Sequence, residues 1–293
     1  MHTLQLNDGH TIPAQAYGTC AIGGWQQDDQ YVVDTILKAI ACGYRHFDTA
    51  SLYGNERSLG KAIQASGIPR EEFFIVSKVW DNQQGYEQTL TAFEQSLARL
   101  QMEYVDLYLV HWPVPEQTRA TWQAMEALHD QGKVRSLGLS NFRQQDIEDL
   151  LGFARIKPTY NQLELHPYLT QSALCDFCQD NGIVVACWSP LGSGTWSNTP
   201  TSEKPIADPV IAAIADKYQV GPAQVILKWD IQQQRIVLPK AESETNMRKN
   251  LELDGFELTE EEIAAINQLN RDHRFGADPD TAYADNMAMT VPA

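Results

Sequence analysis

The chain has 293 residues, of which 43% are hydrophobic and 20% are charged, so it is long enough to bury one large core or two modest ones. Its 22 lysines and arginines against 38 aspartates and glutamates give a net charge of −16. Such an acidic chain is repelled by phosphate backbones and anionic lipid surfaces, which argues against binding to nucleic acids or membranes, although solubility is the simpler explanation of the charge.

The chain begins with two short strand-like runs that flank Asp8-Gly9, a dipeptide typical of a β-hairpin turn. After the hairpin one unit recurs, in which a short apolar run is followed by a longer stretch with helical periodicity. The apolar runs that we predict to be strands are 15–18, 45–48, 73–78, 105–111, 134–140, 159–163, 184–188 and 235–239. The stretches that we predict to be helices are 29–42, 86–100, 118–131, 144–153, 171–181, 208–218 and 259–269, the last opened by a capping box of Thr259 and Glu262.

Most of the strand runs are apolar without alternation, as expected for parallel strands that helices cover. The number, order and length of the units favour one closed (β/α)8 barrel, an α/β TIM barrel formed by residues 1–293 as a single domain. The alternative is a doubly wound open sheet, which usually carries GxGxxG after an early strand, and Gly18, Gly23 and Gly24 do not form that pattern. We expect 192–205 to be a loop on the catalytic rim and the tail from 272 to 293, which has no periodicity, to be irregular.

The five cysteines are an odd number, which favours free thiols in a reducing compartment over a disulfide framework. The N-terminus has neither the basic start nor the apolar core of a signal peptide, and no stretch approaches the ~18 apolar residues of a membrane span. We therefore expect a cytoplasmic monomer that binds no metal and whose partners are small molecules.

Four polar residues stand at or just after the ends of successive predicted strands. Asp48 ends the second strand, Tyr53 follows in the next loop, Lys78 ends the third strand and His111 ends the fourth. Each has an ordinary explanation by itself, such as a helix cap, a solvated lysine, or a packed histidine or tyrosine. In a (β/α)8 barrel, however, the carboxyl ends of the strands carry the active site, so four such residues together predict a catalytic group.

The chemistry of these four residues is mutually consistent. A tyrosine has an ordinary pKa of about 10, and a neighbouring ammonium such as that of Lys78 is expected to lower it towards the range of a useful acid. Asp48 would keep Lys78 charged and in place, and His111 would donate a hydrogen bond to a substrate oxygen. The set predicts a proton donor aimed at a carbonyl oxygen, which a hydride donor would complete as a reductase.

Seven motifs make the chain resemble the aldo-keto reductase family, and they extend from Gly18 to about Leu269. The motifs are GYRHFDTASLYGNE, IVSKVW, YVDLYLVHWP, GKVRSLGLSNF, YNQLELHPY, WSPLGSG and VLPKAESETNMRKN. Within the family the chain is most similar to short-loop bacterial members such as the 2,5-diketo-D-gluconate reductases. The resemblance implies a catalytic tetrad of Asp48, Tyr53, Lys78 and His111, with Tyr53 as the general acid.

The resemblance also implies an NADP(H) cofactor that lies extended across the rim. Its nicotinamide carboxamide is expected to be held by Ser140, Asn141 and Gln162, with Trp188 stacked on the ring. Further cofactor contacts are expected from Thr19, Ser189, Leu191, Ser193, Lys240, Ser243 and Asn250. Trp80 and Trp112 are expected to form the aromatic walls of the substrate site together with His111.

The chain departs from the family pattern at two places. Cys20 stands where the family has a tryptophan that walls the pocket, and Trp25 is one candidate to replace it. Asn246 stands where the family has an arginine beside the adenosine phosphate, and Glu242 replaces a small apolar residue nearby. Because asparagine cannot make the bidentate phosphate contact of arginine, we predict a weakened preference for NADPH over NADH, with NAD(H) as a second candidate cofactor.

We therefore predict an NAD(P)H-dependent carbonyl reductase that acts on small aldehydes or ketones, sugar-derived carbonyls and keto acids included. One alternative is a non-catalytic nucleotide sensor or regulatory subunit on the same fold. A second is an unrelated barrel enzyme such as a hydrolase, for which Glu164 and His166 are the only suitable pair in the sequence.

Overall fold

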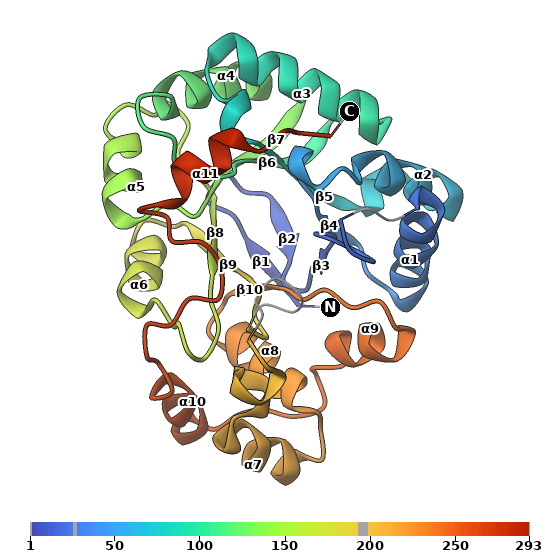
Figure 1. Ribbon diagram of the computed structural model, residues 1–293, viewed down its shortest axis with the longest axis vertical. Coiled ribbons are helices and arrows are strands. Elements are labelled where there is room, and N and C mark those ends of the chain that lie inside the picture. Colours follow the sequence, from blue (N-terminus) through green and yellow to red (C-terminus); the bar gives the residue numbers. More distant parts are fainter. Residues whose placement is uncertain (1, 26–27, 193–198, 293) are drawn as a thin grey trace.

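Figure 1 shows the computed structural model, which describes residues 2–25, 28–192 and 199–292. Eight parallel strands form one sheet in the order β10-β9-β8-β7-β6-β5-β4-β3, and helices surround this sheet on the outside. The first and last strand segments are also joined, because Ala16 N donates to Val237 O and Val237 N donates to Ala14 O. The structure therefore confirms the predicted (β/α)8 barrel.

The observed elements follow the predicted ones closely in the barrel. Its strands are β3 (Tyr17–Gly18), β4 (His46–Asp48), β5 (Phe74–Val79), β6 (Val105–Val110), β7 (Val134–Ser140), β8 (Tyr160–Glu164), β9 (Val184–Trp188) and β10 (Ile236–Leu238). The predicted helices correspond to α1 (Asp29–Cys42), α3 (Tyr86–Leu100), α4 (Thr118–Asp130), α5 (Gln144–Leu151), α6 (Ser172–Asp180), α7 (Pro209–Tyr218) and α10 (Glu260–Asn267). The capping box of Thr259 and Glu262 is present at the start of α10.

The predicted hairpin covers one end of the barrel. Its strands β1 (Thr3–Gln5) and β2 (Thr11–Pro13) pair antiparallel, and Leu4 and Ile12 pack in one cluster with the barrel residues Leu107 and Ala186. Asn7 Nδ2 donates to the carbonyl oxygens of residues 158 and 182, which precede β8 and β9. The hairpin thus closes the amino-terminal end of the strands and leaves the carboxyl ends as the open rim.

Three further helices lie in segments for which we predicted no element: α2 (Glu56–Ser66), α8 (Pro222–Gln232) and α9 (Glu244–Leu251). Within α2, Gly60 allows the helix backbone to approach the end of α3, since a Cβ there would lie 2.1 Å from Leu100 O. Short 3-10 turns follow two strands, η1 (Ser51–Tyr53) after β4 and η3 (Asp81–Gln83) after β5. Both carry side chains to the rim.

The tail is not irregular throughout, because residues Ala282–Ala288 form the helix α11. The prediction is wrong for this segment. It has no side-chain cap and too few residues to be stable by itself, and it is held by contacts to the barrel rim that no local pattern encodes. Figure 1 shows α11 at one side of the barrel mouth.

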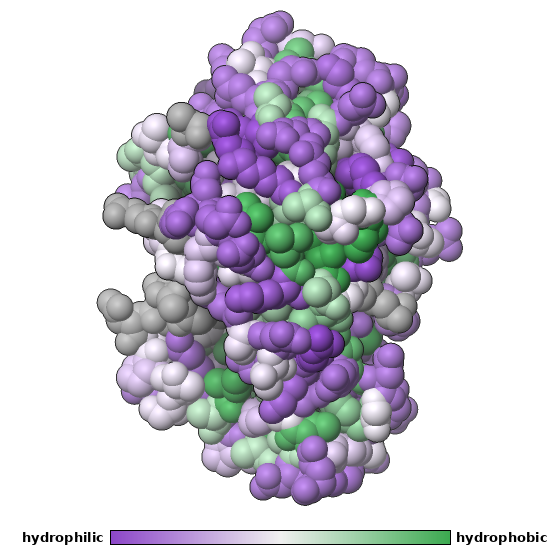
Figure 2. All heavy atoms as spheres, turned by 90° about the vertical axis from the view of Figure 1, so that its right-hand side faces the viewer, coloured by the Kyte–Doolittle hydropathy of each residue, from purple (hydrophilic) through white to green (hydrophobic). Residues whose placement is uncertain are grey.

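The molecular surface on the side of α1 and α2 is largely hydrophilic, with hydrophobic side chains gathered in small patches (Figure 2). No helix in the described residues is long and apolar enough to cross a membrane. All five cysteines are free.

Cys175 and Cys178 of α6 have the C-x-x-C spacing that zinc and redox sites use. Both side chains are buried, and burial raises the pKa of their thiols to about 11 and about 12, so neither is a thiolate at neutral pH. Within residues 2–25, 28–192 and 199–292, no group of three His, Cys, Asp or Glu side chains could hold a metal ion.

Candidate active site

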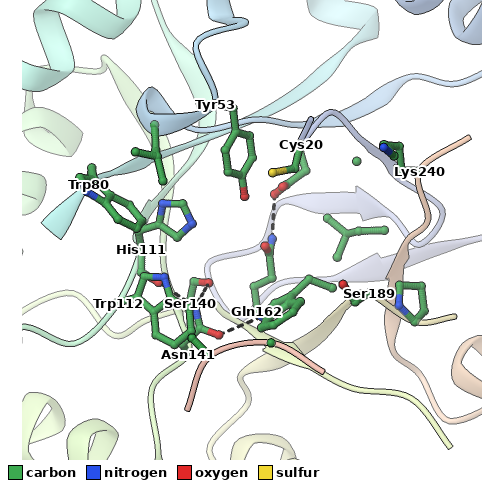
Figure 3. Close-up of a pocket in the computed structure, with 18 of the residues that line it drawn as sticks. Cys20, Tyr53, Trp80, His111, Trp112, Ser140, Asn141, Gln162, Ser189 and Lys240 are labelled. Atoms are coloured by element: carbon green, nitrogen blue, oxygen red, sulfur yellow. Dashed lines mark hydrogen bonds between the residues drawn. The ribbon is translucent and has the colours of Figure 1, made fainter. Parts of the chain in front are cut away.

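A cavity of about 410 Å³ opens at the carboxyl ends of the barrel strands (Figure 3). The predicted site residues that line it are Asp48, Tyr53, Trp80, His111, Trp112, Ser140, Asn141, Gln162, Trp188, Ser189, Leu191 and Lys240. Lys78 of β5 is fully buried beside this cavity. The structure therefore brings the four predicted catalytic residues, most of the predicted cofactor residues and both tryptophan walls to one place.

Lys78 is fixed by three oxygen atoms. Its Nζ lies 2.5 Å from Asp48 Oδ1, 2.9 Å from the carbonyl oxygen of Thr49 and 3.3 Å from the hydroxyl of Tyr53. An ammonium group has three N–H donors, so all of them are used. The other carboxylate oxygen of Asp48 accepts a hydrogen bond from Gln162 Nε2 at 2.7 Å. Asp48 thus holds Lys78 in place, as the sequence predicts.

Tyr53 comes from η1, and its hydroxyl points into the cavity near Cys20 (Figure 3). The prediction that Lys78 lowers the pKa of this phenol is wrong. Burial raises the pKa of Tyr53 well above its ordinary value, and Cys20 and Asp48 raise it further. The physical reason is that Asp48 lies only 2.5 Å from the ammonium, so the phenol faces an ion pair instead of a lone cation. Tyr53 is therefore a protonated phenol at neutral pH.

His111 lies between Tyr53 and Trp80, with ring centroids 5.7 Å and 4.8 Å away and both pairs edge-on. Burial lowers the pKa of its imidazole well below the ordinary value, and the positive charge of Lys78 lowers it further, so the ring is neutral. Its Nδ1 is buried and has no hydrogen-bond partner among the described residues. A protonated phenol and a neutral imidazole can both donate a hydrogen bond, so the two rings can act on one oxygen atom of a bound molecule.

Three amide and hydroxyl side chains line the next part of the cavity. Asn141, whose φ of 63° is unusual for a residue other than glycine, donates from Nδ2 to Ser140 Oγ and accepts from Trp188 Nε1 at 2.8 Å. Gln162 uses its amide N–H for Asp48 and keeps its amide oxygen as an acceptor. Because Trp188 is held through its indole N–H, its ring has a defined orientation at the cavity wall.

The remaining predicted cofactor residues do not all line the cavity. Ser189, Leu191 and Lys240 line the cavity, whereas Ser193 lies outside the described residues. Thr19 is buried and donates from its side chain to Asp48 O at 2.9 Å, so in this structure it supports the strand end that carries Asp48.

Ser243 and Asn250 do not line the cavity and lie on the segment of α9. Ser243 caps the helix by accepting a hydrogen bond from Asn246 N at 3.3 Å, and Asn250 is buried on the inner face. A molecule that extends from the cavity past Lys240 would meet α9 at this exposed N-terminal turn.

Glu242 joins the first loop of the barrel to the segment after β10. Its carboxylate accepts from Gly23 N at 3.0 Å and from the Tyr31 hydroxyl at 2.7 Å, and it lies 3.3 Å from Lys240 Nζ. The same Nζ donates to Ala21 O at 2.9 Å. Despite partial burial, these contacts lower the pKa of Glu242, so it is a carboxylate that partly neutralises Lys240.

Four residues of the tail also line the cavity: Gly276, Ala277, Asn286 and Met289. Sequence reasoning missed them because the tail has no periodicity that would indicate its path. Cys20 lines the cavity in place of the family's tryptophan, and Trp25, which is half exposed, is not among the lining residues. The tail therefore forms a part of the cavity wall.

Glu164 and His166, the pair considered for a hydrolase, are buried and serve the tail. Glu164 Oε1 accepts from Phe275 N at 2.7 Å and from Gly276 N at 3.0 Å, and it lies 3.2 Å from His166 Nε2. Neither residue lines the cavity, so the described residues give no support to a carboxylate-based hydrolase at this site.

Comparison with known proteins assigns the family. Residues 16–271 match the model of the aldo/keto reductase family. The glyoxal reductase of Bacillus subtilis is 42% identical over 278 residues, which are 95% of this chain and 96% of that protein. The 9,11-endoperoxide prostaglandin H2 reductase of Trypanosoma cruzi is 42% identical over 263 residues, which are 89% of this chain and 91% of that protein.

A solved structure agrees with the fold. The crystal structure of an aldo-keto reductase from Bombyx mori in complex with NADP superposes with a TM-score of 0.86 at 36% identity, and the match covers 95% of this chain and 96% of that one.

Proposed function

The chain belongs to the aldo/keto reductase family of oxidoreductases, and from this premise we propose that it is an NAD(P)H-dependent reductase of small aldehydes or ketones. The observation that carries the proposal is the contact set of Lys78, bonded to Asp48 at 2.5 Å and to the Tyr53 hydroxyl at 3.3 Å beside a neutral His111. Such a set can give a proton to a carbonyl oxygen. When bound, the reduced nicotinamide supplies the hydride that goes to the carbonyl carbon.

The proton step belongs to Tyr53. As the carbonyl oxygen gains negative charge, Tyr53 transfers its phenolic proton to that oxygen, and its own O–H bond breaks. The Lys78 ammonium then stabilises the resulting phenolate, because it already donates to the same hydroxyl. The raised pKa of Tyr53 suits this order of events, since the phenol keeps its proton until an alkoxide, which is a far stronger base, begins to form.

The residues present fit a nicotinamide cofactor. The amide oxygen of Gln162, which accepts no hydrogen bond within the described residues, would hold the carboxamide together with the polar groups of Ser140 and Asn141, and Trp188 would lie against the ring. Ser189 and Leu191 would contact the pyrophosphate, with Lys240 near the 2′-phosphate. The orientation of Trp188 by Asn141 at 2.8 Å supports this assignment, because it fixes a flat aromatic surface at the cavity wall.

The cofactor is NADP(H), with NAD(H) also accepted. Lys240 favours a phosphate, but it already lies 3.3 Å from the Glu242 carboxylate, and Asn246 supplies no charge. Arg248 is the arginine nearest to Asn246 in sequence, and it is already ion-paired with Glu244 at 2.6 Å.

The test is reduced-nicotinamide consumption with 4-nitrobenzaldehyde, run with NADPH and with NADH in parallel. Turnover by the wild type that is lost in Tyr53→Phe supports the proposal. Binding of NADPH without turnover of any aldehyde or ketone in a broad panel would instead favour the nucleotide sensor.

A further inference from the structure

Three consecutive residues after β5 hold the tail helix against the cavity. Trp80 Nε1 donates to Asn286 O at 3.1 Å, Asn286 Nδ2 donates to Asp81 Oδ2 at 2.9 Å, and Asn82 Nδ2 donates to Met289 O at 2.7 Å. Asn286 and Met289 line the cavity, and so does Trp80. These three bonds, which we call the clasp, therefore hold the α11 part of the tail as a wall of the site.

Asp81 is the one acid of the clasp, and its surroundings are poor for a charge. It is 1% exposed, its Oδ2 accepts from Asn286, and its Oδ1 has no hydrogen-bond partner in the described part of the chain. Burial raises the pKa of this carboxyl from 3.8 to about 7, against the lowering effect of the Asn286 amide. An unpaired charge in such a place is costly, which favours the protonated form.

The other titratable groups nearby do not supply a partner for Asp81. Lys78 of β5 is bonded to Asp48 and Tyr53, and His111, which packs on Trp80, is neutral. The elements packed against η3 carry six titratable groups in the described part of the chain, and none of them is bonded to Asp81. Two of them, Glu94 and Arg99 of α3, are ion-paired with Lys133 and Glu56. The other four are exposed, namely Tyr86 and Glu87 of α3 and Tyr283 and Asp285 of α11.

We propose that Asp81 is a positioning residue for the substrate: its protonated carboxyl keeps α11 docked on the cavity, and its charged form releases the helix. The role in substrate positioning rests on the proposed function, because it takes the cavity to be the substrate site. The docking itself is a property of the free protein.

The direction of the pH effect follows from linkage. In the released state Asp81 meets water, so its pKa returns towards 3.8, whereas in the docked state it is about 7. The docked state therefore binds the proton of Asp81 more tightly than the released state does. The stabilisation of docking by this proton is complete below the pKa of the released state, and it is lost as the pH rises through the pKa of the docked state. Between about pH 6 and about pH 8 the ratio of docked to released protein should fall about tenfold.

Asp81→Asn separates charge from shape. It keeps an acceptor for the Asn286 amide and carries no charge, so it imitates the protonated acid at every pH. Asp285→Asn is the matched control, because it removes an exposed carboxylate from α11 that does not contact Asp81. The measurement is hydrogen exchange of the backbone amides of 282–289 in the free full-length protein, each variant being compared with wild type at the same pH.

For wild type and for Asp285→Asn, we take the ratio of the exchange rate to that of Asp81→Asn at the same pH. This ratio should be about tenfold higher at pH 8 than at pH 6. The same ratio at both pH values overturns the proposal. If Asp81→Asn does not fold, Asn286→Ala provides the second measurement, because it removes the side-chain half of the clasp. It should exchange faster than wild type at pH 6, and equal exchange overturns the proposal.

Kinetics give an independent readout. The KM of wild type for 4-nitrobenzaldehyde should rise several-fold from pH 6 to pH 8 at little-changed kcat, whereas Asp81→Asn should show a constant KM, because the wall binds substrate and transition state alike. An equal rise in both proteins overturns the role in substrate positioning. If the predicted pH dependence of hydrogen exchange is found in a protein without reductase activity, the proposed function is contradicted, whereas the proposed role of Asp81 in docking α11 is supported.

Discussion

Replacing Lys78 by methionine removes the ammonium group and keeps a side chain of similar length. The change eliminates hydrogen bonds to Asp48, to the carbonyl oxygen of Thr49 and to the Tyr53 hydroxyl. It leaves Asp48, which is 4% exposed, with Gln162 as its side-chain partner. We expect both stability and activity to fall, for two separate reasons.

The stability effect comes from the charge that stays behind. Breaking a buried ion pair by removing one partner costs about 3–5 kcal/mol, because the remaining charge is still buried. With an unfolding entropy of about 2.1 cal/mol/K per residue, a chain of 293 residues has about 0.6 kcal/mol/K, so Tm should fall by about 5–8 °C. The activity effect comes from Tyr53, whose developing phenolate loses its cation, and should be about 10²–10⁴-fold in kcat.

The two effects are distinguished by Asp48→Asn combined with Lys78→Met. The double variant has no stranded carboxylate, so it should recover most of the lost Tm while its kcat stays low. Melting curves and steady-state kinetics with 4-nitrobenzaldehyde are measured for both variants and wild type. A single variant that melts within 1 °C of wild type, or a double variant no more stable than the single one, would refute the assignment of a charged, buried Lys78–Asp48 pair.

Three further changes test the remaining assignments. Tyr53→Phe should lower kcat about 10²–10⁴-fold with cofactor affinity nearly intact. Because burial raises the pKa of Tyr53, kcat of wild type should stay level from pH 6 to pH 9, and a fall in kcat there would mean that the charge of Lys78 outweighs burial. NADP⁺ should quench tryptophan fluorescence, and Trp188→Ala should remove most of the quench, whereas a full quench in the variant would move the stacking residue elsewhere. Asn246→Arg should raise kcat/KM for NADPH about tenfold to a hundredfold, less at high salt, with NADH little changed. A wild type that already prefers NADPH a thousandfold would contradict the reasoning on Asn246.

Local pattern was enough to predict the barrel. Helices such as 29–42 have apolar residues at the helical period, strands such as 134–140 are short runs between such helices, and the observed bounds of both agree with the predicted ones. The helices α2 and α9 went unpredicted since their apolar residues are few and their stability comes from neighbours, as the contact of Gly60 with the end of α3 illustrates. In α11 no residue by itself indicates a helix, because its docking depends on Trp80 and Asp81, about 200 positions away in sequence.

The site divides in the same way. The sequence by itself determined which side chains stand at the strand ends, because in a parallel barrel every carboxyl end meets the same rim, and Asp48, Lys78 and His111 were placed there correctly. Only the tertiary structure decided their ionisation and the shape of the pocket. The pKa of Tyr53 depends on burial and on a carboxylate that neutralises the neighbouring cation. The substrate wall depends on a tail that is anchored to Glu164 of β8 and to Asp81 of η3. Both are set by contacts between residues far apart in sequence, which no local pattern records.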